Sequence, residues 1–280
     1  MFKGHDLLET AVLASIEAGK VIMEVYDSAF EVEYKDDKSP LTEADRRANT
    51  VINQYLQRTD IPIISEENKQ LDYAVRKDWE TCWVVDPVDG TKEFVKRNGE
   101  FTVNIALVTD GVPGLGVIYV PVSRMLYLGN AEDKKAYSCR INEGHESLNS
   151  ILAGCKPLHP REGDPDPIKV VGSRSHMNDT TKEFIELLGG TGKMTEIVSK
   201  GSSLKFCLLA VGEADIYPRF APTMEWDTAA GHAICSALGI NVISQETGEE
   251  LLYNKRNLLN PWFLVFNRKR FSDLPERITS

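Results

Sequence analysis

Two aspartates at the end of a short apolar run are the residues of this chain best suited to chemistry. Val84 and Val85 are β-branched and favour a strand. The next segment, Asp86–Thr91, has the sequence Asp-Pro-Val-Asp-Gly-Thr, and its proline and glycine force a turn. Asp86 and Asp89 therefore leave the strand end together. Two carboxylates held this close need a cation between them, and their hard oxygen ligands suit Mg²⁺. The segment predicts a magnesium-loaded phosphate site.

The spacing of the two aspartates distinguishes two kinds of phosphatase chemistry. Phosphatases of the haloacid dehalogenase type carry Asp-x-Asp-Gly-Thr and use the first aspartate as a covalent nucleophile. This chain instead has Asp-x-x-Asp-Gly-Thr, which argues against an aspartyl-phosphate intermediate. A motif this short also occurs in turns without function, where Asp, Pro and Gly are common.

Carboxylates recur at the ends of two further predicted elements. An apolar run leads to Glu66 and Glu67, and Asp227 lies in the expected first turn of a helix rich in small residues. Taken singly, the glutamates also fit a solvated charge pair, and Asp227 also fits an acid that stabilises a helix start through the helix dipole. Their occurrence together with the aspartate pair favours a functional site.

The three acidic segments, in this order, resemble the signature of the inositol monophosphatase-like, lithium-sensitive, Mg²⁺-dependent phosphatases. The resemblance covers most of the chain, because the lysine-rich loop Lys35–Lys38 and the helix start Leu41–Asp45 also match. No ligand position departs from the family pattern. The resemblance implies a layered α-β-α-β-α sandwich with the metal site in a cleft between two parts.

The resemblance also implies roles for individual residues. The implied metal ligands are the side chains of Glu66, Asp86, Asp89 and Asp227 and the backbone carbonyl of Val88. Thr91 would hydrogen-bond the attacking water, and Asp45 would orient Thr91 or receive its proton, because a threonine hydroxyl alone is too weak a base. Two or three Mg²⁺ ions would activate the water, so hydrolysis would need no phosphoenzyme. Li⁺ would inhibit by replacing one Mg²⁺.

Within the family, the chain most resembles the 3'(2'),5'-bisphosphate nucleotidases of the CysQ type. The similarity rests on Gly172–His176, Gly201–Lys205 and Arg219–Trp226. It implies hydrolysis of adenosine 3',5'-bisphosphate to AMP and phosphate, which would clear the by-product of sulfate activation. The choice between this nucleotide and the corresponding sulfonucleotide stays open.

The expected substrate contacts lie in both halves of the chain. They are Gly90, Thr91, Ser173, Arg174, His176, Ser202, Lys205 and Asp227. Gly90 precedes an expected helix start, where free amides favour a phosphate. Alternatives remain for several of these residues: Ser202 also fits a helix cap, and His176 also fits a surface residue. Arg219 could bind phosphate or pair with Asp215 or Glu225.

Two other functions are compatible with these residues. An inositol monophosphatase or a fructose-1,6-bisphosphatase would use the same metal core. A non-catalytic sensor of a phosphorylated nucleotide is a different class of protein, but its expected mark, a lost metal ligand or an altered Thr91, is absent from the sequence.

Hydrophobic spacing predicts an α+β first part, residues 1–158, that carries most of the metal ligands. Asp6 with Glu9 resembles a capping box for a long amphipathic helix, and Thr42 with Asp45 would cap a second helix. An antiparallel sheet should follow, formed by Phe101–Val108, Leu115–Val120, Met125–Leu128 and Lys135–Cys139.

The Pro, Gly and Asp cluster at Pro157–Pro167 is the best candidate for a linker. Beyond it, residues 166–280 should form an α/β domain with the substrate-selecting residues and the last metal ligand. Strands are expected near residues 168–172, 194–198, 240–243 and 262–266, and helices near 180–188, 203–212 and 227–238.

Composition is that of a globular enzyme, with 42% hydrophobic and 26% charged residues among 280. A net charge of −10 argues against binding of nucleic acid polymers, whereas a small polyanionic nucleotide needs only a local positive site. Five scattered histidines argue against zinc. The five cysteines are odd in number and widely spaced, which predicts reduced thiols that fill the core.

No apolar run of about 18 residues and no secretory leader is visible, so neither an integral membrane segment nor secretion is expected. A cytoplasmic location follows, and the resemblance leaves open a peripheral association with the cytoplasmic face of the inner membrane. The oligomeric state cannot be predicted from these patterns.

Overall fold

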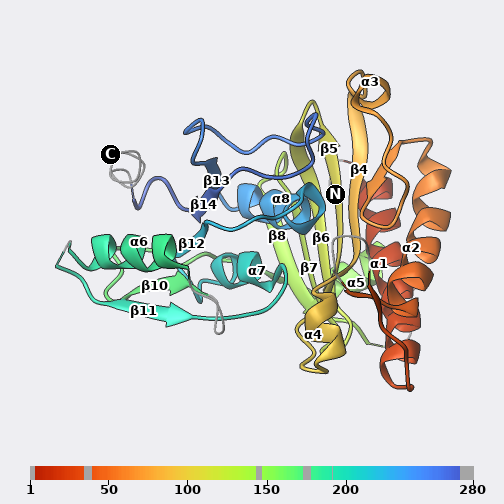
Figure 1. The fold of residues 1–280 in the computed structure, drawn as a ribbon, viewed down its shortest axis with the longest axis horizontal. Coiled ribbons are helices and arrows are strands. Elements are labelled where there is room, and N and C mark those ends of the chain that lie inside the picture. The colour runs from red at the N-terminus through yellow and green to blue at the C-terminus, as the bar shows by residue number, and fades with distance from the viewer. Residues whose placement is uncertain (1–3, 35–39, 143–146, 173–177, 191, 272–280) are drawn as a thin grey trace.

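The computed structural model describes residues 4–34, 40–142, 147–172, 178–190 and 192–271. Within them the chain forms two large sheets with helices between and outside them (Figure 1). The larger sheet contains, in spatial order, β3 (Ile63–Ser65), β4 (Thr81–Asp89), β5 (Thr102–Thr109), β6 (Val112–Val120), β7 (Met125–Asn130), β8 (Lys135–Arg140) and β9 (Lys156–Pro157). β3 and β4 are parallel and the remaining pairs are antiparallel, which confirms the predicted antiparallel sheet.

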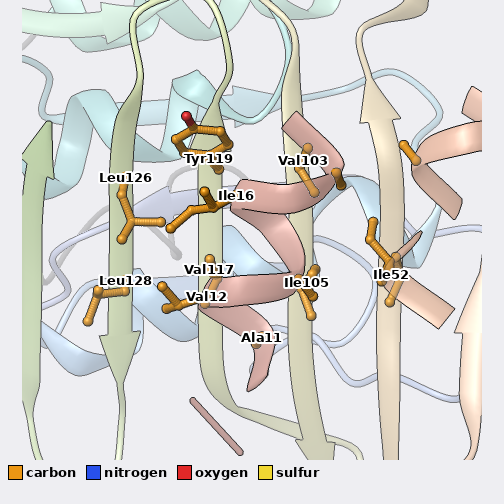
Figure 2. Close-up of a cluster of buried hydrophobic side chains, with 14 of the residues drawn as sticks. Ala11, Val12, Ile16, Ile52, Val103, Ile105, Val117, Tyr119, Leu126 and Leu128 are labelled. Carbon is orange, nitrogen blue, oxygen red and sulfur yellow. The ribbon is translucent and has the colours of Figure 1, made fainter. Parts of the chain in front are cut away.

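Two long helices cover one face of this sheet. They are α1 (His5–Tyr26) and α2 (Glu43–Leu56). Their apolar faces meet the inward side chains of the strands, as Figure 2 shows for Val12 and Ile16 against Val117 and Leu128. The strands alternate the side chains that face the two layers, and burial on both faces explains why β5 is apolar almost throughout.

A helical layer covers the other face of the larger sheet. It contains α7 (Leu204–Ala210) and α8 (Ala229–Ala237). α8 lies very close to the strands, because a Cβ added at Gly116 would come within 2.3 Å of the carbonyl oxygen of Ala230, and one at Gly129 within 2.7 Å of Cα of Ile234. The two glycines therefore set the depth at which α8 sits on the sheet.

The five-stranded sheet lies on the far side of this helical layer. Its spatial order is β11 (Thr195–Val198), β10 (Ile168–Val171), β12 (Ile216–Arg219), β14 (Phe263–Phe266) and β13 (Asn241–Ser244). Its outer face is covered by α6 (Asp179–Gly189) through Phe184, Ile185 and Leu188. The layers thus follow the order α-β-α-β-α (Figure 1), as predicted.

Segment 158–167 contains neither helix nor strand. One hydrophobic cluster draws on both sides of it, with Val84 and Ile118 on one side and Phe206 and Phe263 on the other. The division into two domains at this segment stays a prediction.

Seven short elements complete the described chain. They are β1 (Glu33–Tyr34), β2 (Pro40–Leu41), η1 (Gln57–Thr59), α3 (Tyr73–Arg76), α4 (Thr91–Val95), α5 (Leu148–Ala153) and η2 (Glu225–Asp227). In the described part of the chain, no helix combines the length and the apolar character needed to span a bilayer.

Three local predictions were wrong. The first helix begins after Gly4, whose residue type offers no side-chain cap, so Asp6 and Glu9 do not form a capping box. Asp227 lies in the 3₁₀ turn η2 and not in the first turn of α8. The strand β12 was missed because Pro218 disfavours a strand interior. Pro218 is tolerated because β10 pairs with β12 only at Ile216.

The cysteine prediction was wrong in part. Cys139 and Cys155 form a disulfide, with their Cα atoms 4.4 Å apart. The pairing of Ser138 with Lys156 in the β8–β9 ladder places these two cysteines opposite each other. That register cannot be seen in the spacing of the cysteines. The other three, Cys82, Cys207 and Cys235, are free and buried, as expected for core residues.

Candidate active site

A one-residue irregularity in β4 brings the two central aspartates onto one face of the sheet. Asp86 pairs with Asn104 and Asp89 with Thr102, so three steps along β4 correspond to two steps along β5. Such a bulge inserts one extra residue, here within Pro87–Val88. Because Thr102 and Asn104 share a face, their partners Asp86 and Asp89 share it as well. The spacing Asp-x-x-Asp is therefore the spacing that this bulge requires.

Three carboxylates from two distant segments converge here. Asp86, Asp89 and Asp227 each offer a carboxylate oxygen, and these oxygens lie within 4.8 Å of one another. Glu66 follows β3, and its amide N–H donates to the carbonyl of Val85 at 3.1 Å, which extends the β3–β4 pairing by one step. The charge of Glu66 raises the pKa of both Asp86 and Asp227, so Glu66 contributes to the negative potential at the cluster.

The electrostatics of the cluster are those of a site for a cation. Burial, followed by the charges of Glu66 and the other carboxylates, raises the pKa of Asp86 well above its ordinary range. Burial and the charge of Asp89 raise the pKa of Asp227 to about 8. A cation among these oxygens would relieve both effects. The donors are carboxylates with a nearby backbone carbonyl, at Val88, and such hard oxygen donors fit Mg²⁺.

Asp89 is held by an unusually dense set of donors. Its Oδ2 accepts hydrogen bonds from Asn104 Nδ2 at 3.2 Å, from Ser202 Oγ at 2.6 Å, and from the amide N and Oγ of Ser203, each at 2.6 Å. Ser202 adopts φ 52°, a left-handed conformation that a serine rarely takes. Such strain persists only where the surroundings over-determine it. These bonds fix the orientation of the Asp89 carboxylate and tie the loop before α7 to β4.

Thr91 and Asp45 form a second polar pair beside the aspartates. The Thr91 hydroxyl lies 3.3 Å from Asp45 Oδ1 and 3.2 Å from the carbonyl oxygen of Val88. The other oxygen of Asp45 accepts bonds from the amide N of Thr42 at 2.8 Å and from its hydroxyl at 2.6 Å. This is the predicted capping box of α2. The cap therefore holds the Asp45 carboxylate with Oδ1 toward Thr91.

A cavity of about 580 Å³ opens beside the carboxylates. One wall carries Asp89 and Asp227, and the loop before α7 forms another. Among the described residues, five cations also line it, Lys92, Lys96, Lys200, Lys205 and Arg219, together with Glu93 and Glu100, of which Glu100 pairs with Lys200 at 3.5 Å. The Lys205 ammonium donates to the carbonyl of Ser202 at 3.0 Å, which holds its stem along the cavity wall. The cavity thus combines a carboxylate cluster with a cationic wall.

The structure brings most of the predicted site residues together. Those around the cluster or in the cavity are Asp45, Glu66, Asp86, Val88, Asp89, Gly90, Thr91, Ser202, Lys205 and Asp227. Ser173, Arg174, His176 and the loop Lys35–Lys38 lie outside the described residues. The roles assigned to all these residues remain predictions.

The alternatives for Arg219 are reduced by its surroundings. Asp215 pairs with Arg161 at 3.0 Å and with Arg270 at 2.9 Å. Glu225 pairs with Lys255 at 2.7 Å. Arg219 makes neither of these pairs and lines the cavity, where its charge lowers the pKa of Asp227.

Sequence analysis missed Asn104, which holds Asp89, and the cavity lysines Lys92, Lys96 and Lys200. Ser203 lies in the segment Gly201–Lys205 that the sequence marked, but its bonds to Asp89 were not foreseen. A signal for Asn104 was available. Thr102 and Asn104 are the polar residues in an otherwise apolar strand interior, two positions apart, and such a pair marks a polar contact on one face. The lysines lie on exposed surface and carry no comparable signal.

Comparisons with known proteins give a consistent result. A sequence model described as the inositol monophosphatase family matches residues 4–269. The 3'(2'),5'-bisphosphate nucleotidase CysQ of Salmonella typhimurium LT2 is 45% identical over 266 residues, which cover 92% of this chain and 99% of that protein. CysQ of Escherichia coli K12 is 43% identical over the same length and shares of the two chains.

Solved structures agree with these matches. The crystal structure of CysQ from Bacteroides thetaiotaomicron superposes with a TM-score of 0.84 at 46% identity, covering 94% of this chain and 98% of that one. An inositol monophosphatase from Thermotoga maritima superposes with a TM-score of 0.67 at 22% identity, covering 95% and 94%. The second likeness concerns the fold alone.

Proposed function

This chain belongs to the inositol monophosphatase family, and on that premise we propose that it is a Mg²⁺-dependent 3'(2'),5'-bisphosphate nucleotidase. The reaction is hydrolysis of adenosine 3',5'-bisphosphate to AMP and phosphate. The high-identity relatives named as such nucleotidases support this assignment over nearly their full length.

One observation of the site carries the proposal. The cavity beside the carboxylate cluster also presents a cationic wall that includes Lys205 and Arg219. A substrate with one phosphate needs only the carboxylate cluster and its cations. A second, remote phosphate needs positive charge elsewhere in the same cavity, and this wall provides it. The arrangement therefore suits a small bisphosphate.

Bound Mg²⁺, which we place at two or three positions among the carboxylates, would supply an activated water and neutralise charge on the phosphate. Asp86, Asp89, Asp227 and Glu66 hold the cations, with the carbonyl of Val88. Replacement of one Mg²⁺ by Li⁺ would inhibit the enzyme.

The residues around the cluster perform the remaining tasks. Thr91 orients the attacking water, and Asp45 accepts the proton that passes through the Thr91 hydroxyl, since the two groups lie 3.3 Å apart. Asn104, Ser202 and Ser203 keep Asp89 in place, which confines the phosphate to one position. Direct displacement by water is the proposed course, because the spacing Asp-x-x-Asp-Gly-Thr argues against an aspartyl-phosphate intermediate.

Two alternatives use the same residues differently. An inositol monophosphatase would share the carboxylate cluster but would have less use for a cationic wall, because its substrate carries one phosphate. A fructose-1,6-bisphosphatase would use both the cluster and the wall, and is separated from the proposed function by the identity of the two relatives named as nucleotidases. A sensor that binds the nucleotide without turnover would keep the cavity and show no phosphate release.

The test is phosphate release by purified protein with Mg²⁺. Adenosine 3',5'-bisphosphate, its sulfonucleotide analogue, inositol 1-phosphate and fructose 1,6-bisphosphate are offered at equal concentrations. We expect the nucleotide to be hydrolysed with the highest kcat/KM, and Asp89→Asn to lose activity by about 10³-fold or more. Asp110→Asn, an exposed carboxylate in the β5–β6 turn, is the matched control and should retain full activity.

Each outcome has a definite meaning. A preference for inositol 1-phosphate or fructose 1,6-bisphosphate would contradict the assigned substrate and leave the metal chemistry in place. Nucleotide binding without turnover of any substrate would favour the sensor. Activity that survives in Asp89→Asn would contradict the assigned metal site itself.

A further inference from the structure

A chain of hydrogen bonds runs behind Asp227, from the exposed carboxylate of Glu250 to Thr228 at the edge of the cavity. It is formed by Tyr253 and Glu250, which precede β14, and by His232 of α8. His232 is 2% exposed and Tyr253 3% exposed, and neither lines the cavity. Polar side chains this deeply buried are kept where they are hydrogen-bonded, so the partners of these groups indicate what they do.

The inner end of the chain is Thr228, the residue after Asp227. The Tyr253 hydroxyl donates to Thr228 Oγ1 at 3.2 Å, and the Thr228 hydroxyl donates to the carbonyl oxygen of Glu225 at 3.1 Å. Burial raises the pKa of Tyr253, so the phenol keeps the proton that it donates. The Tyr253 oxygen also lies 3.1 Å from His232 Nδ1, so the imidazole contacts the phenol directly.

The outer end of the chain is Glu250. Its Oε2 lies 3.1 Å from His232 Nε2 and accepts from the amide N of Val242 at 3.1 Å, while Oε1 accepts from Asn241 Nδ2 at 2.7 Å. Two bonds thus anchor Glu250 to β13. Contacts at both ring nitrogens fix the plane of the His232 imidazole, and with it the position of the Tyr253 hydroxyl.

The turn that holds Asp227 depends on such outside contacts. η2 is a three-residue 3₁₀ turn, a conformation with poor internal hydrogen bonding. The amide N of Met224 donates to Asp227 Oδ2 at 2.9 Å, which fixes one carboxylate oxygen. Asn260 Nδ2 donates to Met224 O at 2.8 Å and to Thr228 Oγ1 at 3.0 Å. Thr228 therefore receives two bonds, one from Asn260 and one from Tyr253.

We propose that Tyr253, oriented by His232, is a positioning residue for Asp227, and that it acts through Thr228 to hold η2 where the carboxylate meets Asp86 and Asp89. The inference rests on the metal-dependent function proposed above. Loss of the Tyr253 hydroxyl frees one side of Thr228, lets the turn relax, and weakens the binding of cations. Partners that orient metal-binding carboxylates typically change metal affinity by about 10- to 100-fold when removed.

The primary experiment measures Mg²⁺ binding by isothermal titration calorimetry, with no substrate present. Tyr253→Phe keeps the ring and removes the hydroxyl, and we expect it to bind Mg²⁺ about tenfold more weakly than the unmodified protein. Tyr119→Phe is the matched control, because Tyr119 is 5% exposed, lies against Gly19 of α1, and is remote from this chain. Its Mg²⁺ affinity should be unchanged.

Two substitutions at His232 separate hydrogen bonding from packing. His232→Asn keeps a group that can hydrogen-bond at the position of Nδ1, whereas His232→Leu fills a similar volume without one. We expect His232→Asn to retain near-normal Mg²⁺ affinity and His232→Leu to resemble Tyr253→Phe. This pair also serves if Tyr253→Phe does not fold.

Two results would overturn this inference, provided that the unmodified protein binds Mg²⁺ and hydrolyses the nucleotide. One is a normal Mg²⁺ affinity in Tyr253→Phe. The other is an equal Mg²⁺ affinity in the two His232 variants. Failure of the unmodified protein to bind Mg²⁺ would overturn the proposed function, and this inference with it.

Discussion

Removing divalent cations should make the stability of the protein fall as the pH rises from about 6 to about 7.5. Burial and the charge of Asp89 raise the pKa of Asp227 from 3.8 to about 8. Burial and the neighbouring carboxylates also raise the pKa of Asp86. In this range the folded chain therefore keeps a proton that the unfolded chain has released. Because the unfolded state binds fewer protons, the free energy of unfolding decreases as the pH increases.

The size of the effect follows from the number of protons. One proton bound only in the folded state changes the free energy of unfolding by about 1.4 kcal/mol per pH unit, so Asp227 alone contributes about 2 kcal/mol across this range. For a protein of this size, that corresponds to a fall in Tm of about 4 to 8 °C. A further proton on Asp86 would steepen the decline. Saturating Mg²⁺ should remove it, because a bound cation stabilises the ionised carboxylates.

Thermal unfolding followed by circular dichroism measures this directly. The protein is scanned at one rate in EDTA and in excess Mg²⁺, at several pH values and constant ionic strength. Asp227→Asn is the matched variant, because it removes the titrating group and keeps an oxygen for the bond from Met224. In EDTA it should show a shallower pH dependence and a higher Tm near pH 7.5 than the unmodified protein.

The reasoning would be refuted by a cation-free protein whose Tm rises over this pH range. It would be refuted equally by an Asp227→Asn variant with the same pH dependence as the unmodified protein.

Three further predictions concern catalysis, specificity and packing. Thr91→Val should lower kcat by about 10²- to 10⁴-fold with little change in KM, because it removes the hydroxyl that orients water. Steady-state kinetics measures both constants. A raised KM with an unchanged kcat would show that Thr91 only binds substrate. Lys205→Met should raise the KM for adenosine 3',5'-bisphosphate by about tenfold and leave the KM for a nucleoside 3'-monophosphate unchanged. An equal rise in KM for both substrates would exclude a contact between Lys205 and the second phosphate. Gly116→Ala should destabilise the protein by about 1 to 3 kcal/mol in urea unfolding, because its Cβ would meet the Ala230 carbonyl at 2.3 Å. Gly114→Ala, in the same strand with its nearest contact at 4.0 Å, should be nearly neutral, and similar losses at both positions would argue against the close packing of α8.

Features that depend on neighbours along the chain could be predicted from the sequence. The strand at Val84–Val85, the capping box of Thr42 with Asp45, and the meander of β5 to β8 all follow from local propensity and hydrophobic spacing. Each is decided by residues within a few positions of one another. The acidic motifs marked the carboxylates of the candidate site for the same reason. The turn expected at Pro87 was placed too early, because β4 continues through a bulge to Asp89.

Features that depend on strand register and on distant contacts could not be predicted from the sequence. The four donors on Asp89 Oδ2 come from β5 and from the loop before α7, and the disulfide follows from the β8–β9 register. β12 forms despite Pro218 because β10 pairs with it only at Ile216, so no ladder bond from β10 is lost at the proline.

The 3₁₀ turn at Asp227 belongs to the same group, since it is held by Asn260 and Tyr253 from a later segment. The sequence by itself therefore determined which side chains could bind a cation and a phosphate. Only the tertiary structure decided which of them meet and what holds them, because hydrogen bonds and packing between segments outweigh local preference in a buried site.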